Sequence, residues 1–501
     1  MKHLIRQLER SHEFWMVIGL VFSFFLLRLP SLFEPYWYGD EGIYETIGLA
    51  ITKGRILYTE IWDNKPPLLY YTYALVHSNQ FFVRCLSLIV GAASVVVFFL
   101  LARKLFVNRL AIGVATGVFT LLFGVPSFEG NIANAENFML LPIIISGFFI
   151  YSLVKESSSH KRLLTGKLLG ISGLLLGIAF LYKIVAVFDF AAFFTFLVIA
   201  TFGDQVSLKK VITYSQQFWR RFALFILCFS IPFLLSVLYF LLVGGLDEYF
   251  RAVFQSTVGY VGYKNAFIIP QGLLISKIIL LVTFVLVLFF KRQKISPTTL
   301  FIFLWTGFSL FNCFFSQRPY THYLLVLIPS FSLLIGQLVT VKKTALIAHL
   351  VVVLALTITA LNYFDHWSVK RTINYYSNFV SFISGEKSID DYNSFFDKKT
   401  VRDNEIVNYI NSHKKSVTSL FVWGNTAQIY PQTGTLPPGR FTVAYHISGI
   451  AKYEQETKEA LTKNPPQFIV IMDDVSSYPY SMYNYSQTLR IQNATIYERI
   501  Y

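Results

Sequence analysis

The chain has 501 residues, of which 54% are hydrophobic and only 14% are charged. An ordinary soluble protein carries about 25% charged residues, so this composition excludes one and favours membrane-spanning helices. The formal net charge of +15 does not indicate a nucleic-acid partner, because the lysines and arginines gather in short clusters between apolar runs.

Apolar runs of roughly 17 to 23 residues, the length that a helix needs to cross a bilayer, recur up to about residue 363. The first run, Phe14–Leu32, has no small-residue cleavage site after it, so we expect a transmembrane helix and not a signal peptide. About eleven spans are predicted, at 14–33, 81–101, 110–126, 138–154, 168–182, 184–202, 222–243, 271–290, 298–315, 322–340 and 345–363.

Basic clusters in alternate connections predict the topology. The clusters lie at 2–10, 103–109, 155–167, 209–221, 291–294 and 342–343. All of them fall on one side only if the stretch 168–202 forms two spans divided at Lys183. Because short cytoplasmic loops are enriched in lysine and arginine, we expect a cytoplasmic N-terminus and a C-terminus outside.

The first outside loop, residues 34–80, begins with a predicted helix in GDEGIYETIGLAITKG. Asp40 is expected to cap this helix, Glu41 to lie in its first turn and Gly54 to end it. Isoleucines four residues apart make one face apolar, as in a helix that lies flat at the membrane interface. The loop is therefore predicted to carry interfacial structure.

A second interfacial helix is predicted in WDNKPPLLYYTYAL. Pro66 holds Lys65 extended, and Pro66-Pro67 can start the helix. Taken singly, Asp40 can be a helix cap, Glu41 a favourable charge at a helix N-terminus and Lys65 a snorkelling lysine. Together, an acidic pair and a lysine near a membrane surface indicate a site for a lipid phosphate.

Two further charged residues are singled out. Arg28 lies inside the first apolar run, where an ionised group needs a partner. Glu136 lies just before the fourth span, in the same compartment as the loop acids. Glu136 is either a membrane-flanking carboxylate or part of the same site.

After residue 363 the composition becomes that of a globular domain. SVTSLFVW, RFTVAYHI and PPQFIVIMDD predict strands, because they are rich in β-branched and aromatic residues bounded by turn residues. YEQETKEALTKN predicts a helix. We therefore expect a transmembrane domain over 1–363 and a small extracytoplasmic α/β domain over 364–501, in a polytopic α-helical membrane protein.

The ordered set GDEGIY, DNKPPLLY and a carboxylate before the fourth span resembles the C-type integral membrane glycosyltransferases. The nearest likeness is to the branch of the lipid A aminoarabinose transferases and protein O-mannosyltransferases (glycosyltransferase family 39-like). It covers about residues 10–363, and HYLLVLIPSFSLLIG, AENFMLLP and LYKIVAVF extend it. The mannosyltransferases' inserted lumenal domain has no counterpart here, so the acceptor stays open.

This resemblance implies a polyprenyl-phosphate sugar as donor, inversion at the anomeric carbon, and a lipid, glycan or protein as acceptor. Asp40 would be the base or acceptor-orienting carboxylate, and Glu41 and Glu136 would orient the acceptor or bind a divalent metal such as Mg²⁺ or Mn²⁺. Lys65 would contact the donor phosphate. Further donor contacts are expected at Arg318, His322, Tyr323, Lys183, Tyr263 and Lys264.

The resemblance also implies an integral protein of a prokaryotic plasma (inner) membrane. The main alternative is a transporter or flippase of a lipid-linked glycan, which would also need many helices and basic residues at the outer face. Against it, the charged groups lie in loops, and no paired interrupted helices are found in corresponding halves. A membrane scaffold that displays the C-terminal domain would leave the loop acids unexplained.

Overall fold

The computed structural model describes residues 12–156, 162–201, 208–256, 269–316, 320–363, 369–414 and 419–500. The chain forms two compact units. Unit 1 comprises Met1–Leu29, Ser87–Val237 and Val258–Thr372, and unit 2 comprises Pro30–Leu86, Leu238–Thr257 and Ile373–Tyr501. The expected boundary at residue 363 stays a prediction, since the contacts group the first outside loop with the C-terminal segment.

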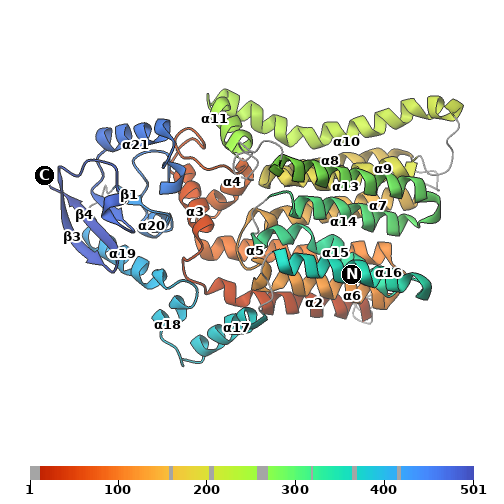
Figure 1. Cartoon of the computed structure of the whole chain (residues 1–501), viewed down its shortest axis with the longest axis horizontal. Helices are drawn as coiled ribbons and strands as arrows, with labels where there is room; N and C mark the ends of the chain where they lie inside the picture. Colours follow the sequence, from red (N-terminus) through yellow and green to blue (C-terminus); the bar gives the residue numbers. More distant parts are fainter. Residues whose placement is uncertain are drawn as a thin grey trace, which may run out of the picture. The chain divides into compact units, whose positions relative to one another are not determined.

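Unit 1 is a helical bundle (Figure 1). Its helices, some of which continue into unit 2, are α2 (His12–Arg28), α5 (Gln80–Leu105), α6 (Arg109–Gly124), α7 (Ala135–Glu156), α8 (Arg162–Tyr182), α9 (Val187–Thr201), α10 (Leu208–Leu242), α13 (Ile269–Lys291), α14 (Pro297–Cys313), α15 (Ile328–Leu338) and α16 (Lys343–Tyr363). Each predicted apolar run coincides with a helix. As expected, the helix breaks at Lys183, where a 3₁₀ turn over Ile184–Ala186 separates α8 from α9.

Within the residues that the structure describes, five helices are long and apolar enough to cross a membrane. They lie at His12–Leu32, Gln80–Leu105, Ala135–Lys155, Phe222–Leu242 and Leu274–Lys294. Shorter apolar helices accompany them, for example Arg109–Gly124 and Ile328–Leu338. The protein is therefore a polytopic membrane protein, and the number of eleven spans stays a prediction.

Phenylalanine rings and close helix contacts build the core of unit 1. Phe98 stacks on Phe119 with ring centroids 4.2 Å apart. Helices α8 and α10 approach so closely that a Cβ atom at Gly173 would lie 2.5 Å from the backbone oxygen of Phe225. Small residues allow such a close approach. The van der Waals packing that results drives helix association in lipid, where no hydrophobic driving force acts between helices.

Unit 2 combines short helices with a four-stranded sheet. Its helices are α3 (Gly39–Thr52), α4 (Pro67–Leu75), α11 (Leu246–Phe250), α17 (Val369–Ile383, from Ile373 onward), α18 (Ile389–Ser394), α19 (Lys399–His413), α20 (Ile429–Thr433) and α21 (Ala451–Lys463). Its strands are β1 (Leu420–Trp423), β2 (Phe468–Ile471), β3 (Tyr485–Ile491) and β4 (Ala494–Arg499). The strand order is β1-β2-β4-β3.

The sheet is mixed. Leu420 of β1 pairs with Phe468 of β2 in a parallel register, and β4 pairs antiparallel with both β2 and β3. Strands β1 and β2 are buried along their whole length. Strands were predicted near 416–423 and 465–474, and β1 and β2 confirm them, although residues 416–418 lie outside the described part of the chain. The helix predicted near 453–464 is confirmed as α21.

The prediction of a strand in RFTVAYHI is wrong. The buried side chains of Phe441 and Val443 made this segment resemble a strand. Its backbone is hydrogen-bonded outside the sheet, because the N–H of Trp62 donates to the carbonyl of Arg440 at 2.9 Å and the N–H of Ala444 donates to the carbonyl of Gly424. The hairpin of β3 and β4 was not predicted.

The apolar face of α3 does not meet lipid as expected from its sequence. Ile43 and Ile47 are 2% and 0% exposed. The hydroxyl of Thr46 donates to the carbonyl of Ala427 at 3.0 Å, and a Cβ atom at Gly42 would lie 2.7 Å from the backbone nitrogen of Gln428. The face is buried because residues just before α20 pack against it.

Candidate active site

Asp40 lies in the first turn of α3, and its side chain does not cap the helix. Tyr38 occupies the N-cap position without a side-chain hydrogen bond, so the interpretation of Asp40 as a cap is wrong. Its carboxylate accepts hydrogen bonds from the hydroxyl of Tyr44 at 3.0 Å and from the Nζ of Lys65 at 3.4 Å. The Asp40 side chain is 37% exposed, so a substrate can reach it.

Lys65 is held in place by its backbone. Its carbonyl accepts a hydrogen bond from the hydroxyl of Tyr58 at 2.7 Å, and its N–H donates to the hydroxyl of Tyr70 at 3.1 Å. Pro66 occupies the N-cap position of α4 and Pro67 is its first residue, so the two prolines start the helix as predicted. The ammonium group lies 4.8 Å from the ring centre of Tyr44, a distance at which cation and ring attract each other. Lys65 therefore carries a positioned cation beside the carboxylate of Asp40.

Asp63 and His446 complete this cluster. The sequence assigned no role to either, although Asp63 begins the DNKPPLLY motif. Asp63 is 2% exposed, accepts a hydrogen bond from the hydroxyl of Tyr70 at 2.7 Å and lies 4.0 Å from the Nζ of Lys65. The Nε2 of His446 lies 3.5 Å from the Oδ1 of Asp63. Burial lowers the pKa of His446 to about 4, against the opposing effect of Asp63, so the imidazole is neutral at neutral pH.

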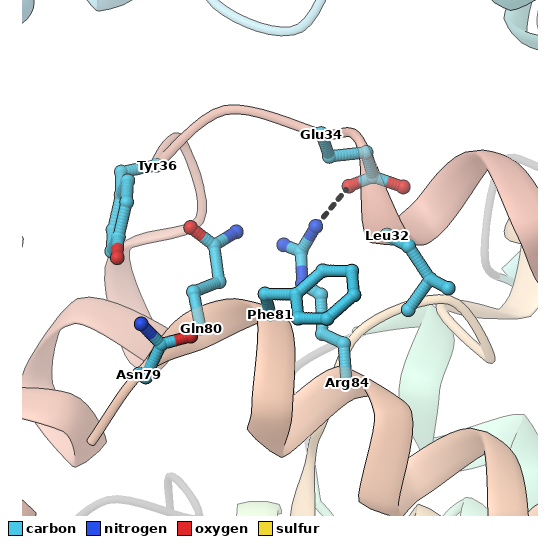
Figure 2. A pocket seen from close by; sticks show the side chains of 7 residues that line it. All are labelled: Leu32, Glu34, Tyr36, Asn79, Gln80, Phe81 and Arg84. Carbon is cyan, nitrogen blue, oxygen red and sulfur yellow. Dashed lines mark ion pairs between the residues drawn. The ribbon is translucent and has the colours of Figure 1, made fainter. Parts of the chain in front are cut away.

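Glu41 pairs with a buried arginine. The Nη2 and Nε atoms of Arg84 lie 2.5 and 3.2 Å from the two carboxylate oxygens of Glu41. Arg84 also donates to the carbonyl of Ser31 at 2.6 Å and lies 3.4 Å from Glu34 (Figure 2). Removing one partner of such a buried pair is costly, because the other charge stays buried.

A second cluster lies within unit 1 and joins residues predicted from three separate segments. The Nζ of Lys183 pairs with Glu136 at the start of α7 and lies 4.7 Å from the ring centre of Tyr323. The Nε2 of His322 lies 4.0 Å from Glu136, and its Nδ1 lies 3.0 Å from Glu129. The structure therefore brings together Lys183, His322, Tyr323 and Glu136, and adds Glu129.

Three predicted donor contacts, Arg318, Tyr263 and Lys264, lie outside the described residues. Glu41 and Glu136, the predicted metal ligands, are each occupied by a cation of the protein. In the described ranges no three His, Cys, Asp or Glu side chains gather as metal ligands do. This arrangement does not fit the predicted divalent metal at either carboxylate.

Comparisons with known proteins agree on the class of protein. Residues 64–235 match the family model of the dolichyl-phosphate-mannose-protein mannosyltransferases; this range includes Lys65, Arg84, Glu136 and Lys183 but not Asp40. No match is found among curated protein sequences.

A similar solved structure is that of ArnT from Cupriavidus metallidurans bound to undecaprenyl phosphate. The TM-score is 0.55 at 14% sequence identity, and the alignment covers 97% of this chain and 98% of that one. At this identity the likeness shows a shared fold over nearly the whole chain. This shared fold and the family model matched over residues 64–235 both agree with the sequence motifs, which resemble those of the integral membrane glycosyltransferases of the GT-C type.

Proposed function

We propose that the protein transfers a sugar from a polyprenyl-phosphate-linked donor to an extracytoplasmic acceptor, with inversion at the anomeric carbon. The neighbours named above support a donor of this kind: the family model describes mannosyltransferases that use dolichyl phosphate mannose, and the structure of similar fold holds undecaprenyl phosphate. The acceptor is a lipid, a glycan or a protein.

The pairing of Asp40 with Lys65 is the observation that carries this proposal. The reaction needs a proton acceptor for the incoming hydroxyl and a cation for the phosphate that leaves. A partly exposed carboxylate lies 3.4 Å from a partly exposed ammonium group, and buried tyrosines hold the backbone of the lysine. Both chemical requirements are met within one compact unit.

In the proposed reaction, Asp40 takes the proton of the acceptor hydroxyl as its oxygen attacks the anomeric carbon. The bond from that carbon to the phosphate oxygen breaks, and its electron pair stays on the lipid phosphate. Lys65 stabilises the negative charge that the leaving phosphate gains. A single displacement of this kind inverts the anomeric centre, and no metal is needed to balance it.

The remaining predicted residues take supporting roles in the proposal. Glu41 is held by Arg84, so we assign it to fixing the first turn of α3, beside Asp40. In unit 1, Lys183, His322 and Tyr323 stay proposed donor contacts. Glu136 is assigned to positioning Lys183.

Transfer of label from polyprenyl-phosphate sugars to endogenous acceptors in proteoliposomes tests the proposal. We expect labelled product that depends on the protein and on a donor with an intact phosphate. Label that only crosses the bilayer would instead support the flippase. If no common hexose or pentose donor gave labelled product or carried label across the bilayer, the proposed donor class would be overturned.

A further inference from the structure

A hollow of about 180 Å³ lies in unit 2 between the loop at residues 32–36 and the first turns of α5. Its lining consists of Leu32, Glu34, Tyr36, Asn79, Gln80, Phe81 and Arg84. Figure 2 shows the side chains of Glu34, Gln80 and Arg84 turned toward one another, with the ring of Phe81 beside them. Asp40 and Lys65, which carry the reaction proposed above, do not line this hollow.

The polar groups of the lining are firmly held. Glu34 accepts hydrogen bonds from the indole of Trp37 at 2.8 Å and from the hydroxyl of Tyr375 at 2.5 Å, besides its ion pair with Arg84. Gln80 is 5% exposed and donates to the carbonyl of Pro35 at 3.1 Å. These contacts fix the polar side chains before any ligand arrives, which lowers the ordering cost of binding.

The charge of this region disfavours an anion. Glu34 and Glu41 carry two negative charges against the single positive charge of Arg84. Burial raises the pKa of Glu45 well above its usual value, and Glu41 adds to this effect. Because the arginine already has carboxylate partners, a phosphate would meet a net negative surface, whereas a neutral ligand would not.

The chemistry of the lining matches a ring that carries many hydroxyl groups. Two amides, a carboxylate and a phenol offer both donors and acceptors of hydrogen bonds. Burial raises the pKa of Tyr36 to about 12, so its hydroxyl keeps its proton. Phe81 adds an aromatic face at which the C–H groups of a sugar ring can pack.

We propose that this hollow is a binding site for a neutral sugar ring, with Phe81 as the stacking face and Asn79, Gln80 and Glu34 as hydrogen-bonding groups. The inference rests on the proposed function in one respect, because the ring would belong either to the lipid-linked donor or to a glycan acceptor. The hollow would bind a neutral ring and no phosphate, which distinguishes it from the proposed phosphate site at Lys65.

The neighbouring phenylalanine provides a matched control. Phe81 and Phe82 begin the same helix and are 48% and 56% exposed, but only Phe81 lines the hollow. If both rings serve only as membrane anchors, Phe81→Ala and Phe82→Ala will behave alike. Both side chains are too exposed for their loss to unfold the protein.

The first experiment measures binding without any reaction. Saturation-transfer NMR of the full-length protein in detergent would use free mannose, glucose, galactose, arabinose and N-acetylglucosamine. We expect at least one of them to give a signal that Phe81→Ala abolishes, that Phe82→Ala preserves and that Phe81→Tyr restores. No signal from the wild type, or equal signals from the two alanine variants, would overturn the proposed site and mean that the hollow holds only water.

The second experiment assigns the sugar to its source. In the transfer assay, loss of the stacking face should raise one KM about three- to tenfold, as expected for one aromatic contact, and leave kcat nearly unchanged. A rise in the donor KM places the donor sugar in the hollow, and a rise in the acceptor KM places the acceptor there. If the wild type transfers no sugar, the proposed function fails, while the NMR result still decides whether the site exists.

Discussion

Replacement of Asp40 by Asn separates the proposed catalytic role of this residue from its structural one. The amide keeps the shape of the side chain and an acceptor oxygen for the hydroxyl of Tyr44. It loses the negative charge that faces Lys65. That ion pair is partly exposed, and exposed pairs contribute about 0–1 kcal/mol to stability. The unfolding midpoint should therefore hardly change.

The effect on transfer should be much larger. Loss of a general base costs about 10²- to 10⁴-fold in rate, which corresponds to roughly 3–5 kcal/mol in the activation barrier. The assay is the initial rate of label transfer in proteoliposomes with equal amounts of inserted protein. Asp390→Asn is a matched control, because Asp390 is an exposed aspartate in the first turn of α18. Transfer by Asp40→Asn within tenfold of the wild type would remove Asp40 as the base.

The other predictions concern donor binding, stability and pH. Lys65→Gln should raise the donor KM about 10- to 100-fold, the loss expected for one charged hydrogen bond, whereas exposed Lys458→Gln should not; an unchanged KM would contradict the phosphate contact. Arg84→Leu should destabilise the protein by about 3–5 kcal/mol, because Glu41 stays buried without its partner, and an unchanged unfolding midpoint would refute this. The pKa of His446 in the folded protein is about 4, below its value in the unfolded chain. The neutral histidine therefore contributes at most about 3 kcal/mol to the free energy of unfolding above about pH 6.5. This contribution is lost as the pH falls toward 4. As the pH is lowered from 7 to 4, the unfolding midpoint of His446→Gln should fall less steeply than that of the wild type. Equal slopes for the two proteins would exclude this contribution.

The membrane helices could be predicted from sequence because length and apolarity decide them locally. A run of about 20 apolar residues has few alternatives to a spanning helix, and each predicted run is a helix in the structure. The strand β3 lacks such a signal. Most of its residues are exposed or half-buried, so YSQTLRI shows too few apolar positions to predict a strand.

The candidate site could be predicted only in part. Asp40 and Lys65 lie 25 residues apart on one loop, and the resemblance to a known family pointed to both. His446 lies far along the chain from Asp63, and no local pattern in a single sequence connects them. Arg84 had a usable signal, because a single arginine at the edge of an apolar run needs a partner, as was recognised for Arg28.

The C-terminal segment belongs to the structure that positions Asp40. Its residues cover the face of α3 that the sequence suggested would lie on lipid: Ala427 accepts a hydrogen bond from Thr46, and Gly434 accepts one from Lys53 at 2.6 Å. It also supplies His446 beside Asp63. A scaffold that merely displays a soluble domain would not need these contacts. An enzyme would need these contacts, because its catalytic helix must hold one orientation. A shift of about 1 Å in a reacting group can cost about 100-fold in rate.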